Sequence, residues 1–407
     1  MRCGLLGRKL GHSYSPQIHS RMAAYPYVLF EKEPEELEHF LKFGDFTGIN
    51  VTAPYKKDVI PYLDELTPTA KRLGAVNTIV RHNGRLIGHN TDYFGFLTMV
   101  RASRMDVTGK KVLVLGSGGA SNTAVAVLQE LGANVIVISR SGENNYGNLE
   151  RHSDASVIVN TTPVGMYPNT DRSPIDLTLF PNLQGVLDVI YNPARTMLLR
   201  QAEALKLPTM NGLLMLVAQA KEASEWFSGH PLDDSVIREI HRELRRQMEN
   251  IILIGMPGCG KSTLGTEIAK KLGKRFMDAD IELIAAAGRS IPEIFAADGE
   301  TGFRELETAV LAELGKQSGL VIATGGGCVT RRENYSLLHQ NGTVFWIRRD
   351  LSKLPIDGRP LSQANKLDEM YRIRKPLYDA FADYAIENDG SMESAAAEIL
   401  RIWEENL

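Results

Sequence analysis

The chain has little cysteine and few aromatic residues, and it lacks any long hydrophobic run. Its 407 residues include only 3 cysteines, an odd number without metal-ligand spacing, so a disulfide framework is not expected. No segment reaches the roughly 18 consecutive apolar residues of a membrane-spanning helix, and the first residues lack a hydrophobic targeting core. We therefore expect a cytoplasmic protein without a membrane partner.

An excess of charge of one sign is also missing. The sequence has 46 basic and 49 acidic residues, a net charge of −3, with no long run of either sign. Proteins whose main partner is nucleic acid or an acidic membrane surface usually carry a basic excess. The balance therefore favours small-molecule ligands. The length suggests two or three domains, and we expect a monomer or homodimer.

The clearest motif present is a phosphate-binding loop. An apolar, strand-like run at 251–254 leads into a loop with glycines at 255, 258 and 260, and a helical pattern follows. In such loops backbone N–H groups surround phosphate, the lysine reaches the outer phosphates, and the next hydroxyl ligates Mg²⁺. The pattern predicts a nucleotide site at Gly258, Cys259, Gly260, Lys261, Ser262 and Thr263, with Ser262 as a metal ligand.

A second motif bears on which nucleotide is bound. Asn365–Asp368 spells the guanine-reading tetrapeptide of GTPases, but polar residues precede it where those proteins have an apolar strand. The segment is more typical of a loop that runs into a helix. ATP is therefore the nucleotide that we expect.

The first two-thirds of the chain alternate short apolar runs with helical patterns, which predicts βα units and mainly parallel sheets. A helical pattern at 212–227 ends at Ser228-Gly229, and 230–250 follows as a connector with one narrow apolar stripe. Its arginines fit either an interaction surface or, the interpretation we favour, the solvated face of a docked linker. The strands predicted from apolar runs are 111–115, 134–138, 157–160, 186–189, 320–323 and 343–347.

A glycine-rich turn lies between the first two of these strands. Gly116, Gly118 and Gly119 join a strand to a helix in a variant of the dinucleotide fingerprint. The following strand ends in Ser139-Arg140, where NAD-binding folds prefer an acidic residue, and Arg140 suits a 2′-phosphate instead. NADP is therefore favoured, although a βαβ unit without cofactor stays open on these residues alone.

Polar residues gather in four segments of the N-terminal third: 12–16, 48–56, 74–78 and 88–92. A lysine and an aspartate at one cleft can handle a proton while hydride moves, with Lys56 polarising a carbonyl and Asp92 holding or exchanging the proton. The sequence alone does not establish that these segments meet.

These segments closely resemble shikimate dehydrogenase over about the first 230 residues. The motifs are HSYSP, GINVTAPYK, GAVNT, GHNTDYFGF, GSGGAS, NTTPVGM, DVIYNPARTMLL and GLLMLVAQA, in that order. One departure is Ser139-Arg140-Ser141 followed by Glu143, where the family often has a second basic residue. The resemblance implies catalysis by Lys56 and Asp92, substrate binding by Ser13, Ser15, Thr52, Asn77, Asp92, Tyr191 and Gln219, and NADP binding by Gly116, Gly118, Gly119, Ala120, Arg140, Thr161 and Gly212.

Residues from about 249 onward resemble shikimate kinase, with FMDAD, GFRELE, GGG, RPL and RKPLY supporting the phosphate loop. A small carboxylated polyol needs arginine forks for its carboxylate and an acceptor for its hydroxyls. We expect Arg304 and Arg374 to bind the carboxylate and Asp280 to orient the attacking oxygen. Gly326 and Gly327 form a wall beside the ring, Asp278 supports Mg²⁺, and Arg359, on a lid at about 351–362, binds ATP and acts with Lys261 on the transferring phosphoryl group.

The predicted architecture is α/β throughout, with a substrate-binding domain, an NADP-binding Rossmann domain and a P-loop kinase domain. We predict NADPH-dependent reduction of 3-dehydroshikimate to shikimate and Mg²⁺- and ATP-dependent phosphorylation of shikimate. The alternatives are a quinate-preferring dehydrogenase fused to the kinase and a non-catalytic metabolite sensor. The predicted boundaries are 1–95 with helix 210–229, 96–209, a connector helix at 230–248, and 249–407.

Overall fold

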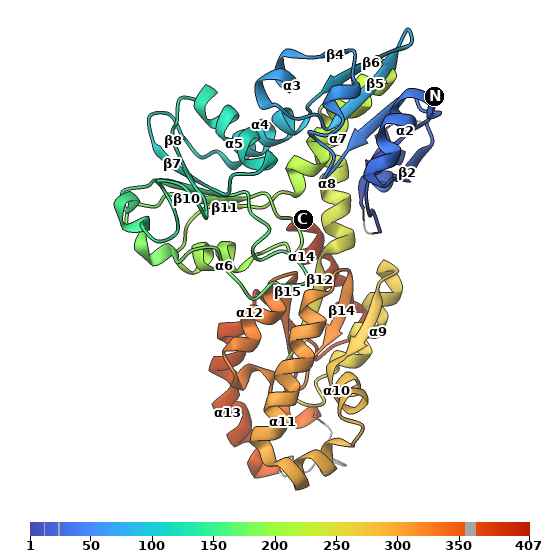
Figure 1. The fold of residues 1–407 in the computed structure, drawn as a ribbon. Coiled ribbons are helices and arrows are strands. Elements are labelled where there is room, and N and C mark those ends of the chain that lie inside the picture. The colour runs from blue at the N-terminus through green and yellow to red at the C-terminus, as the bar shows by residue number, and fades with distance from the viewer. Residues whose placement is uncertain (12, 23–24, 355–363) are drawn as a thin grey trace. The chain divides into compact units, whose positions relative to one another are not determined.

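The computed structural model describes residues 1–407 except 12, 23–24 and 355–363. It divides into two compact units, and both are α/β structures, as predicted (Figure 1). The first unit comprises Met1–Tyr191 and Thr196–Arg242, and the second comprises Asn192–Arg195 and Glu243–Leu407. The division between the units falls inside helix α8 (Ser235–Met248).

The first sheet of unit 1 has six strands in the order β2-β1-β3-β5-β6-β4. Strand β1 is parallel to β2 and β3, whereas β5 runs antiparallel to β3 and β6. This β5–β6 hairpin turns at Asn83-Gly84, both at positive φ. The pairings of β5 are antiparallel, whereas the other described pairings of this sheet are parallel, so the sheet is mainly parallel as expected. The strands are β1 (Cys3–Gly7), β2 (Tyr27–Glu31), β3 (Gly48–Val51), β4 (Glu65–Leu66), β5 (Thr78–His82) and β6 (Arg85–His89).

Helix α7 (Leu213–Ser228) packs on this first sheet although it lies far along the chain. It contacts α1, α4, β3 and β5, and a Cβ on Gly48 of β3 would come within 2.2 Å of the Phe227 ring. The predicted stop signal at Ser228-Gly229 is confirmed, and Gly229 caps the helix in the left-handed conformation. The other helices of this lobe are α1 (Ser15–Met22), α2 (Leu37–Phe43), α3 (Pro68–Leu73) and α4 (Asp92–Ser103).

The second sheet of unit 1 is wholly parallel, in the order β11-β10-β9-β7-β8. Three of its strands match their predicted bounds, and β10 begins one residue earlier than predicted. Buried β7 and β9 are rich in Val, Ile and Leu, as expected of parallel strands covered on both faces. The elements are β7 (Lys111–Leu115), α5 (Gly119–Glu130), β8 (Asn134–Ile138), β9 (Val157–Asn160), β10 (Gly185–Asp188), α6 (Met197–Ala204) and β11 (Thr209–Met210).

Unit 2 contains a five-stranded parallel sheet in the order β13-β14-β12-β15-β16. Helix α13 includes Asn365–Asp368, so the GTPase-like tetrapeptide lies on a helix rather than after a strand. The strands are β12 (Asn250–Ile254), β13 (Arg275–Asp278), β14 (Leu320–Ala323), β15 (Gly342–Arg348) and β16 (Tyr384–Glu387). The helices are α9 (Lys261–Leu272), α10 (Ala279–Ala287), α11 (Ile291–Lys316), α12 (Glu333–His339), α13 (Ala364–Phe381) and α14 (Met392–Glu405).

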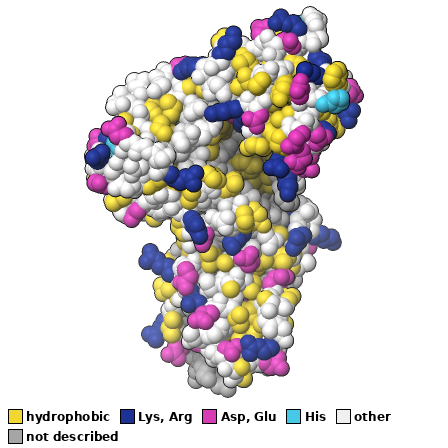
Figure 2. All heavy atoms as spheres, in the orientation of Figure 1, with side chains coloured by type: hydrophobic (Ala, Val, Ile, Leu, Met, Phe, Trp, Pro, Cys, Tyr) yellow, Lys and Arg dark blue, Asp and Glu magenta, His cyan; other side chains and the backbone are white. Residues whose placement is uncertain are grey.

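Acidic and basic side chains are interspersed over the face drawn in Figure 2, in keeping with the near-neutral composition. Within the described ranges, no helix combines the length and apolarity needed to span a bilayer.

Candidate functional sites

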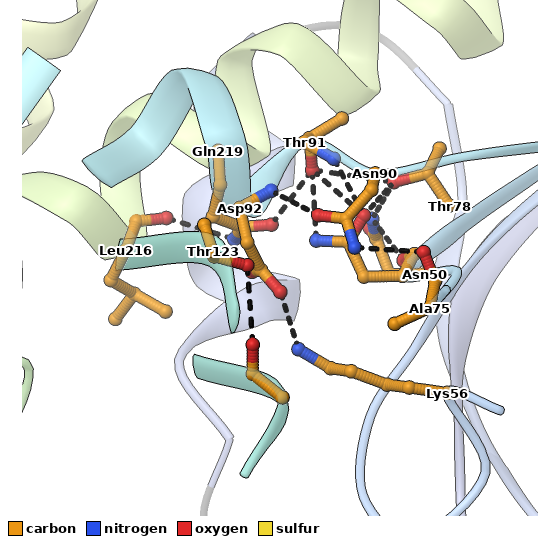
Figure 3. A network of polar contacts seen from close by, with 12 residues as sticks. Asn50, Lys56, Ala75, Thr78, Asn90, Thr91, Asp92, Thr123, Leu216 and Gln219 are labelled. Atoms are coloured by element: carbon orange, nitrogen blue, oxygen red, sulfur yellow. Dashed lines mark hydrogen bonds and ion pairs between the residues drawn. The ribbon is translucent and has the colours of Figure 1, made fainter. Parts of the chain in front are cut away.

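The structure brings Lys56 and Asp92 together. Lys56 lies in the loop after β3 and Asp92 is the first residue of α4, and Lys56 Nζ is 2.6 Å from Asp92 Oδ2 (Figure 3). The two side chains are 31% and 15% exposed, so the ion pair is partly buried but open on one side. A paired cation and carboxylate at such a position can bind and protonate a carbonyl oxygen.

A hydrogen-bond network holds the start of α4 beside Asn77 and Gln219. Buried Asn77 accepts from the Thr91 N–H at 2.7 Å and donates to Thr91 Oγ1 at 3.1 Å. Thr91 Oγ1 donates to Gln219 Oε1 at 3.3 Å, and Asn90 Oδ1 accepts from the Asp92 N–H at 3.1 Å. Asn77 and Gln219 are therefore tied to the Lys56–Asp92 pair through residues 90–92. Figure 3 shows Gln219 beside Thr91 and Asp92.

Gly95 makes this approach of two helices possible. A Cβ at Gly95 would lie 2.7 Å from Met215 O, closer than real Cβ atoms approach, and 3.0 Å from Gln219 Cβ, which is tighter than most real contacts. Because glycine has no side chain there, α4 can pack closely on α7 and Gln219 can reach Thr91.

The predicted serines, one just before helix α1 and one at its first residue, flank Tyr14, which contacts Tyr191. The Ser15 N–H donates to Ser13 Oγ at 3.2 Å, and the Tyr14 and Tyr191 rings meet edge to face at 6.1 Å between centroids. Burial, with a smaller contribution from Tyr14, raises the pKa of Tyr191. No hydrogen bond within the described part of the chain joins these serines to the Lys56–Asp92 pair.

Thr52 follows β3, and its N–H donates to Leu6 O at 3.0 Å. Its side chain lies near Gly7, where an added Cβ would be 2.8 Å from Thr52 Cγ2. Thr52 is thus placed at the same end of the sheet as Lys56, which follows it by four residues.

Sequence reasoning missed Asn50 and Tyr27. Asn50 on β3 is 6% exposed and donates to Thr78 Oγ1 at 3.1 Å, while the Tyr27 hydroxyl donates to Asn50 Oδ1 at 2.8 Å. The sequence did contain one indication of this contact: the amide of Asn50 stands between the apolar residues Ile49 and Val51 of a strand. A buried amide needs hydrogen-bond partners, so such a position predicts a polar contact.

The glycine-rich turn after β7 forms an open cradle at the start of α5. Gly116 has a φ of 109°, and a Cβ there would lie 2.9 Å from Thr161 Oγ1. Gly118 caps α5, and added Cβ atoms at Gly118 and Gly119 would meet no atom within 4 Å. Ala120 follows in the first helical turn. The exposed backbone at a helix N-terminus suits the pyrophosphate of a dinucleotide, so the residues present fit NADP.

Two further residues predicted for NADP lie on nearby segments of unit 1. Arg140 is exposed and lies two residues after the end of β8, the neighbour of β7. Gly212 caps α7, and a Cβ there would lie only 1.9 Å from Val189 O, so the end of β10 packs directly on the helix start. No side chain fits at Gly212 without moving that backbone.

Unit 2 contains a pocket of about 820 Å³ at the carboxyl end of its sheet. The pocket collects every predicted kinase residue in the described ranges except Cys259, which is buried within the phosphate loop. Arg359 was also predicted here, but it lies outside the described residues. The predicted residues that line the pocket are Gly258, Gly260, Lys261, Ser262, Thr263, Asp278, Asp280, Arg304, Gly326, Gly327 and Arg374.

The phosphate loop folds around its own lysine. Lys261 Nζ donates to the carbonyls of Gly255 and Met256 at 2.9 and 3.0 Å. Ser262 Oγ donates to Asp278 Oδ2 at 2.6 Å. A hydroxyl and a carboxylate side by side are the hard oxygen donors that Mg²⁺ prefers, so this pair fits that ion.

The other wall of the pocket is built from acidic and arginine side chains. Arg304 donates to Glu307 Oε2 at 2.7 Å, and a Cβ at Gly325 would lie 2.6 Å from Glu307 Oε1 and 2.9 Å from Asp280 Oδ1. Arg374 donates to Gly326 O at 3.2 Å. Burial raises the pKa of Glu307, and Arg304 partly offsets that rise. Glu307 also lines the pocket. It is the last residue of the GFRELE motif, but no function was predicted for it from the sequence.

Models of two known protein families match parts of this chain. The family model described as shikimate dehydrogenase substrate binding domain matches residues 5–79, and the shikimate kinase model matches residues 257–404. A relative from Clostridium perfringens (strain SM101), named shikimate dehydrogenase (NADP(+)), is 36% identical over 264 residues, which cover 60% of this chain and 97% of the relative.

The N-terminal part of this chain belongs to the shikimate dehydrogenase family. The structure of shikimate dehydrogenase 1 from Peptoclostridium difficile matches with 38% identity and a TM-score of 0.56, covering 60% of this chain and 98% of that one. The Thermus thermophilus enzyme in complex with NADP(H) and shikimate matches with 32% identity and a TM-score of 0.54, covering 60% and 99%. The chain is thus an enzyme that joins a shikimate dehydrogenase to a shikimate kinase domain.

Within the shikimate dehydrogenase part, buried Asp188 orders the segment that carries Tyr191. It accepts from Thr196 Oγ1 at 2.7 Å and from Asn160 Nδ2 and the Ile190 N–H, both at 3.0 Å. Burial outweighs these bonds and raises the pKa of Asp188 from 3.8 to about 7. The native state therefore holds a proton between about pH 4 and pH 7 that the unfolded chain has released.

Because of that proton, Asp188 should lower the free energy of unfolding as pH rises through this window, by up to about 1.4 kcal/mol per pH unit. Asp188→Asn cannot ionise and keeps one acceptor oxygen, so its stability relative to the wild type should improve from pH 5 to pH 8. Thermal unfolding of both full-length proteins measures this, with the dehydrogenase transition recognised by its shift on adding NADP⁺. Parallel pH profiles would contradict the assignment.

Proposed function

We propose that the chain performs two consecutive steps on one small acid: NADPH-linked reduction of 3-dehydroshikimate to shikimate, and ATP-dependent phosphorylation of the shikimate 3-hydroxyl. One observation carries the proposal. The Lys56–Asp92 pair in unit 1 and the pocket containing Lys261 and Asp280 in unit 2 occur in a single chain. The matched families of these two parts both take their names from shikimate.

For the first step, the Gly116–Ala120 turn would hold NADPH, which would supply the hydride when bound. The Lys56 ammonium polarises the ketone oxygen and donates a proton to it as the hydroxyl forms. Asp92, 2.6 Å from Lys56, holds the ammonium in place. Asn77 and Gln219, tied to Thr91, hold ring hydroxyls, and Ser13 and Ser15 bind the carboxylate.

For the second step, Asp280 accepts a hydrogen bond from the attacking hydroxyl and orients its oxygen towards the outer phosphate. Arg304 and Arg374 bind the shikimate carboxylate. The Ser262 hydroxyl and the Asp278 carboxylate would hold Mg²⁺, which would neutralise negative charge on the phosphates. Lys261 leaves its loop carbonyls and neutralises charge on the transferring group.

Two assays test the proposal on the purified chain. Oxidation of shikimate and of quinate is measured with NADP⁺ and with NAD⁺, and ADP release is measured with shikimate, ATP and Mg²⁺. We expect NADP-linked oxidation of shikimate and shikimate-dependent ADP release. A clear preference for quinate would replace the first assignment, and binding of both metabolites without turnover would indicate a sensor.

Gly327 provides a sharper test of the kinase site. A Cβ there would lie 2.1 Å from an Arg304 terminal nitrogen, so Gly327→Ala must displace the guanidinium. Loss of one charge-assisted hydrogen-bond pair should raise the KM for shikimate roughly tenfold or more. The KM for ATP in the same variant is the internal control and should stay nearly unchanged. Equal rises in both constants would argue against a carboxylate-binding role for Arg304.

A further inference from the structure

Arg349 lines the unit 2 pocket, although no motif of the sequence pointed to it. It is the first residue after strand β15. In the sheet, β15 lies on one side of β12, and the strands that lead to the expected shikimate-binding groups lie on the other side. Its Nε atom is buried and has no hydrogen-bond partner among the described residues. An arginine held in a pocket with an unsatisfied buried donor is poised for an anionic ligand.

The neighbouring Arg348 also has a buried Nε without a hydrogen-bond partner among the described residues, but the rest of its guanidinium has different surroundings. Its guanidinium lies 4.3 Å from the centroid of the Trp346 ring and forms ion pairs with Glu387 at 3.2 Å and Asp379 at 3.7 Å. Arg348 does not line the pocket. The two adjacent arginines therefore have separate surroundings, one engaged by carboxylates and one facing the pocket.

Sheet topology places Arg349 on the nucleotide side. The phosphate loop follows β12, and β15 pairs with β12 on the flank away from β14 and β13. Asp280 follows β13 and Gly325–Gly327 follow β14, so these expected shikimate groups lie on the opposite flank. A Cβ at Gly255 would lie 2.5 Å from Ile347 O, which shows how closely the chain leading to Arg349 runs beside the phosphate loop.

The other basic side chains of the pocket already have partners. Lys261 donates to two loop carbonyls, Arg304 pairs with Glu307, and Arg374 donates to Gly326 O. A nucleoside triphosphate brings several negative charges, and kinases neutralise them with more than one cation.

We propose that Arg349 is a nucleotide-binding residue that contacts the phosphates of ATP from the end of β15. This inference rests on the proposed kinase function and names a residue of that same site. A position directly after a strand of the central sheet holds the guanidinium in place before the nucleotide arrives, which reduces the entropy lost on binding.

The test compares Arg349→Met, Arg349→Lys and the matched control Arg348→Met in the full-length protein. Steady-state kinetics give KM for ATP, KM for shikimate and kcat, and calorimetry gives the Kd of ADP. Loss of hydrogen bonds to a charged group should raise the KM for ATP and the Kd of ADP roughly ten- to hundredfold in Arg349→Met. The KM for shikimate should change little, Arg349→Lys should recover part of the loss, and Arg348→Met should bind ADP as the wild type does.

The outcomes separate failure of the inference from failure of the function. A wild-type protein that releases no ADP with shikimate would remove the kinase function itself. A normally active wild type with an unchanged KM for ATP and Kd of ADP in Arg349→Met would overturn the inference alone. A rise confined to the KM for shikimate would place Arg349 on the other substrate and also overturn it. Unchanged dehydrogenase activity in unit 1, together with a wild-type melting transition, verifies that each variant is folded.

Discussion

Replacement of Lys56 by alanine should lower dehydrogenase activity by about 10²- to 10⁴-fold, the range that a positioned general acid contributes. The Nζ of Lys56 is the cation 2.6 Å from Asp92, and its loss removes the group that we assign to the ketone oxygen. Initial rates of NADP⁺ reduction with shikimate measure the effect. The ADP release catalysed by unit 2 should be unchanged.

Lys57→Ala is the matched control, because this neighbouring lysine is exposed. It should keep dehydrogenase activity close to that of the wild type. If Lys56→Ala retained most of its kcat and changed only KM, Lys56 would bind substrate without taking part in proton transfer. A comparable loss in Lys57→Ala would show that general charge near the cleft, rather than the Lys56–Asp92 geometry, supports the reaction.

The reciprocal change, Lys261→Ala, should abolish phosphorylation and leave the dehydrogenase intact. We expect a loss of roughly 10²-fold or more in kcat, as for removal of one donor that stabilises developing charge. Lys270→Ala, an exposed lysine on the same helix α9, is the matched control. ADP release with shikimate is the measurement, and NADP-linked oxidation on the same preparation verifies folding. Loss of both activities in a folded Lys56 or Lys261 variant would exclude independent sites.

The parts of the sites that depend on local chain geometry could be predicted from the sequence. The phosphate loop places Lys261 and Ser262 by its own turn and helix start, and the glycine turn at Gly116 does the same for the dinucleotide cradle. Both patterns combine a strand, a loop and a helix within about 20 residues, so no distant contact is needed to interpret them.

Contacts between residues far apart in the sequence were harder to predict. The link from Thr91 to Gln219 spans 128 residues and depends on the absent side chain of Gly95. Asn50 and Tyr27 were missed because their role comes from burial beside Thr78, which a single sequence does not display. The Asn83-Gly84 hairpin was a local signal that we overlooked when the surrounding runs suggested parallel strands.

Arg349 illustrates a different limit. Two adjacent arginines at the end of a strand look equivalent in sequence, and only the fold distinguishes Arg348, beside the Trp346 ring, from Arg349, which lines the pocket. The resemblance to shikimate kinase implies roles for Arg304, Arg359 and Arg374, whereas Arg349 lies outside the motifs that carry this resemblance.

One coupled assay tests the central claim most directly. The purified chain is supplied with 3-dehydroshikimate, NADPH, ATP and Mg²⁺, and the products are identified by mass spectrometry. We predict shikimate 3-phosphate, with NADPH oxidised and ADP released in equal amounts once the first substrate is consumed. Accumulation of shikimate without its phosphate, or no consumption of 3-dehydroshikimate, would contradict the account of two active sites that share one metabolite.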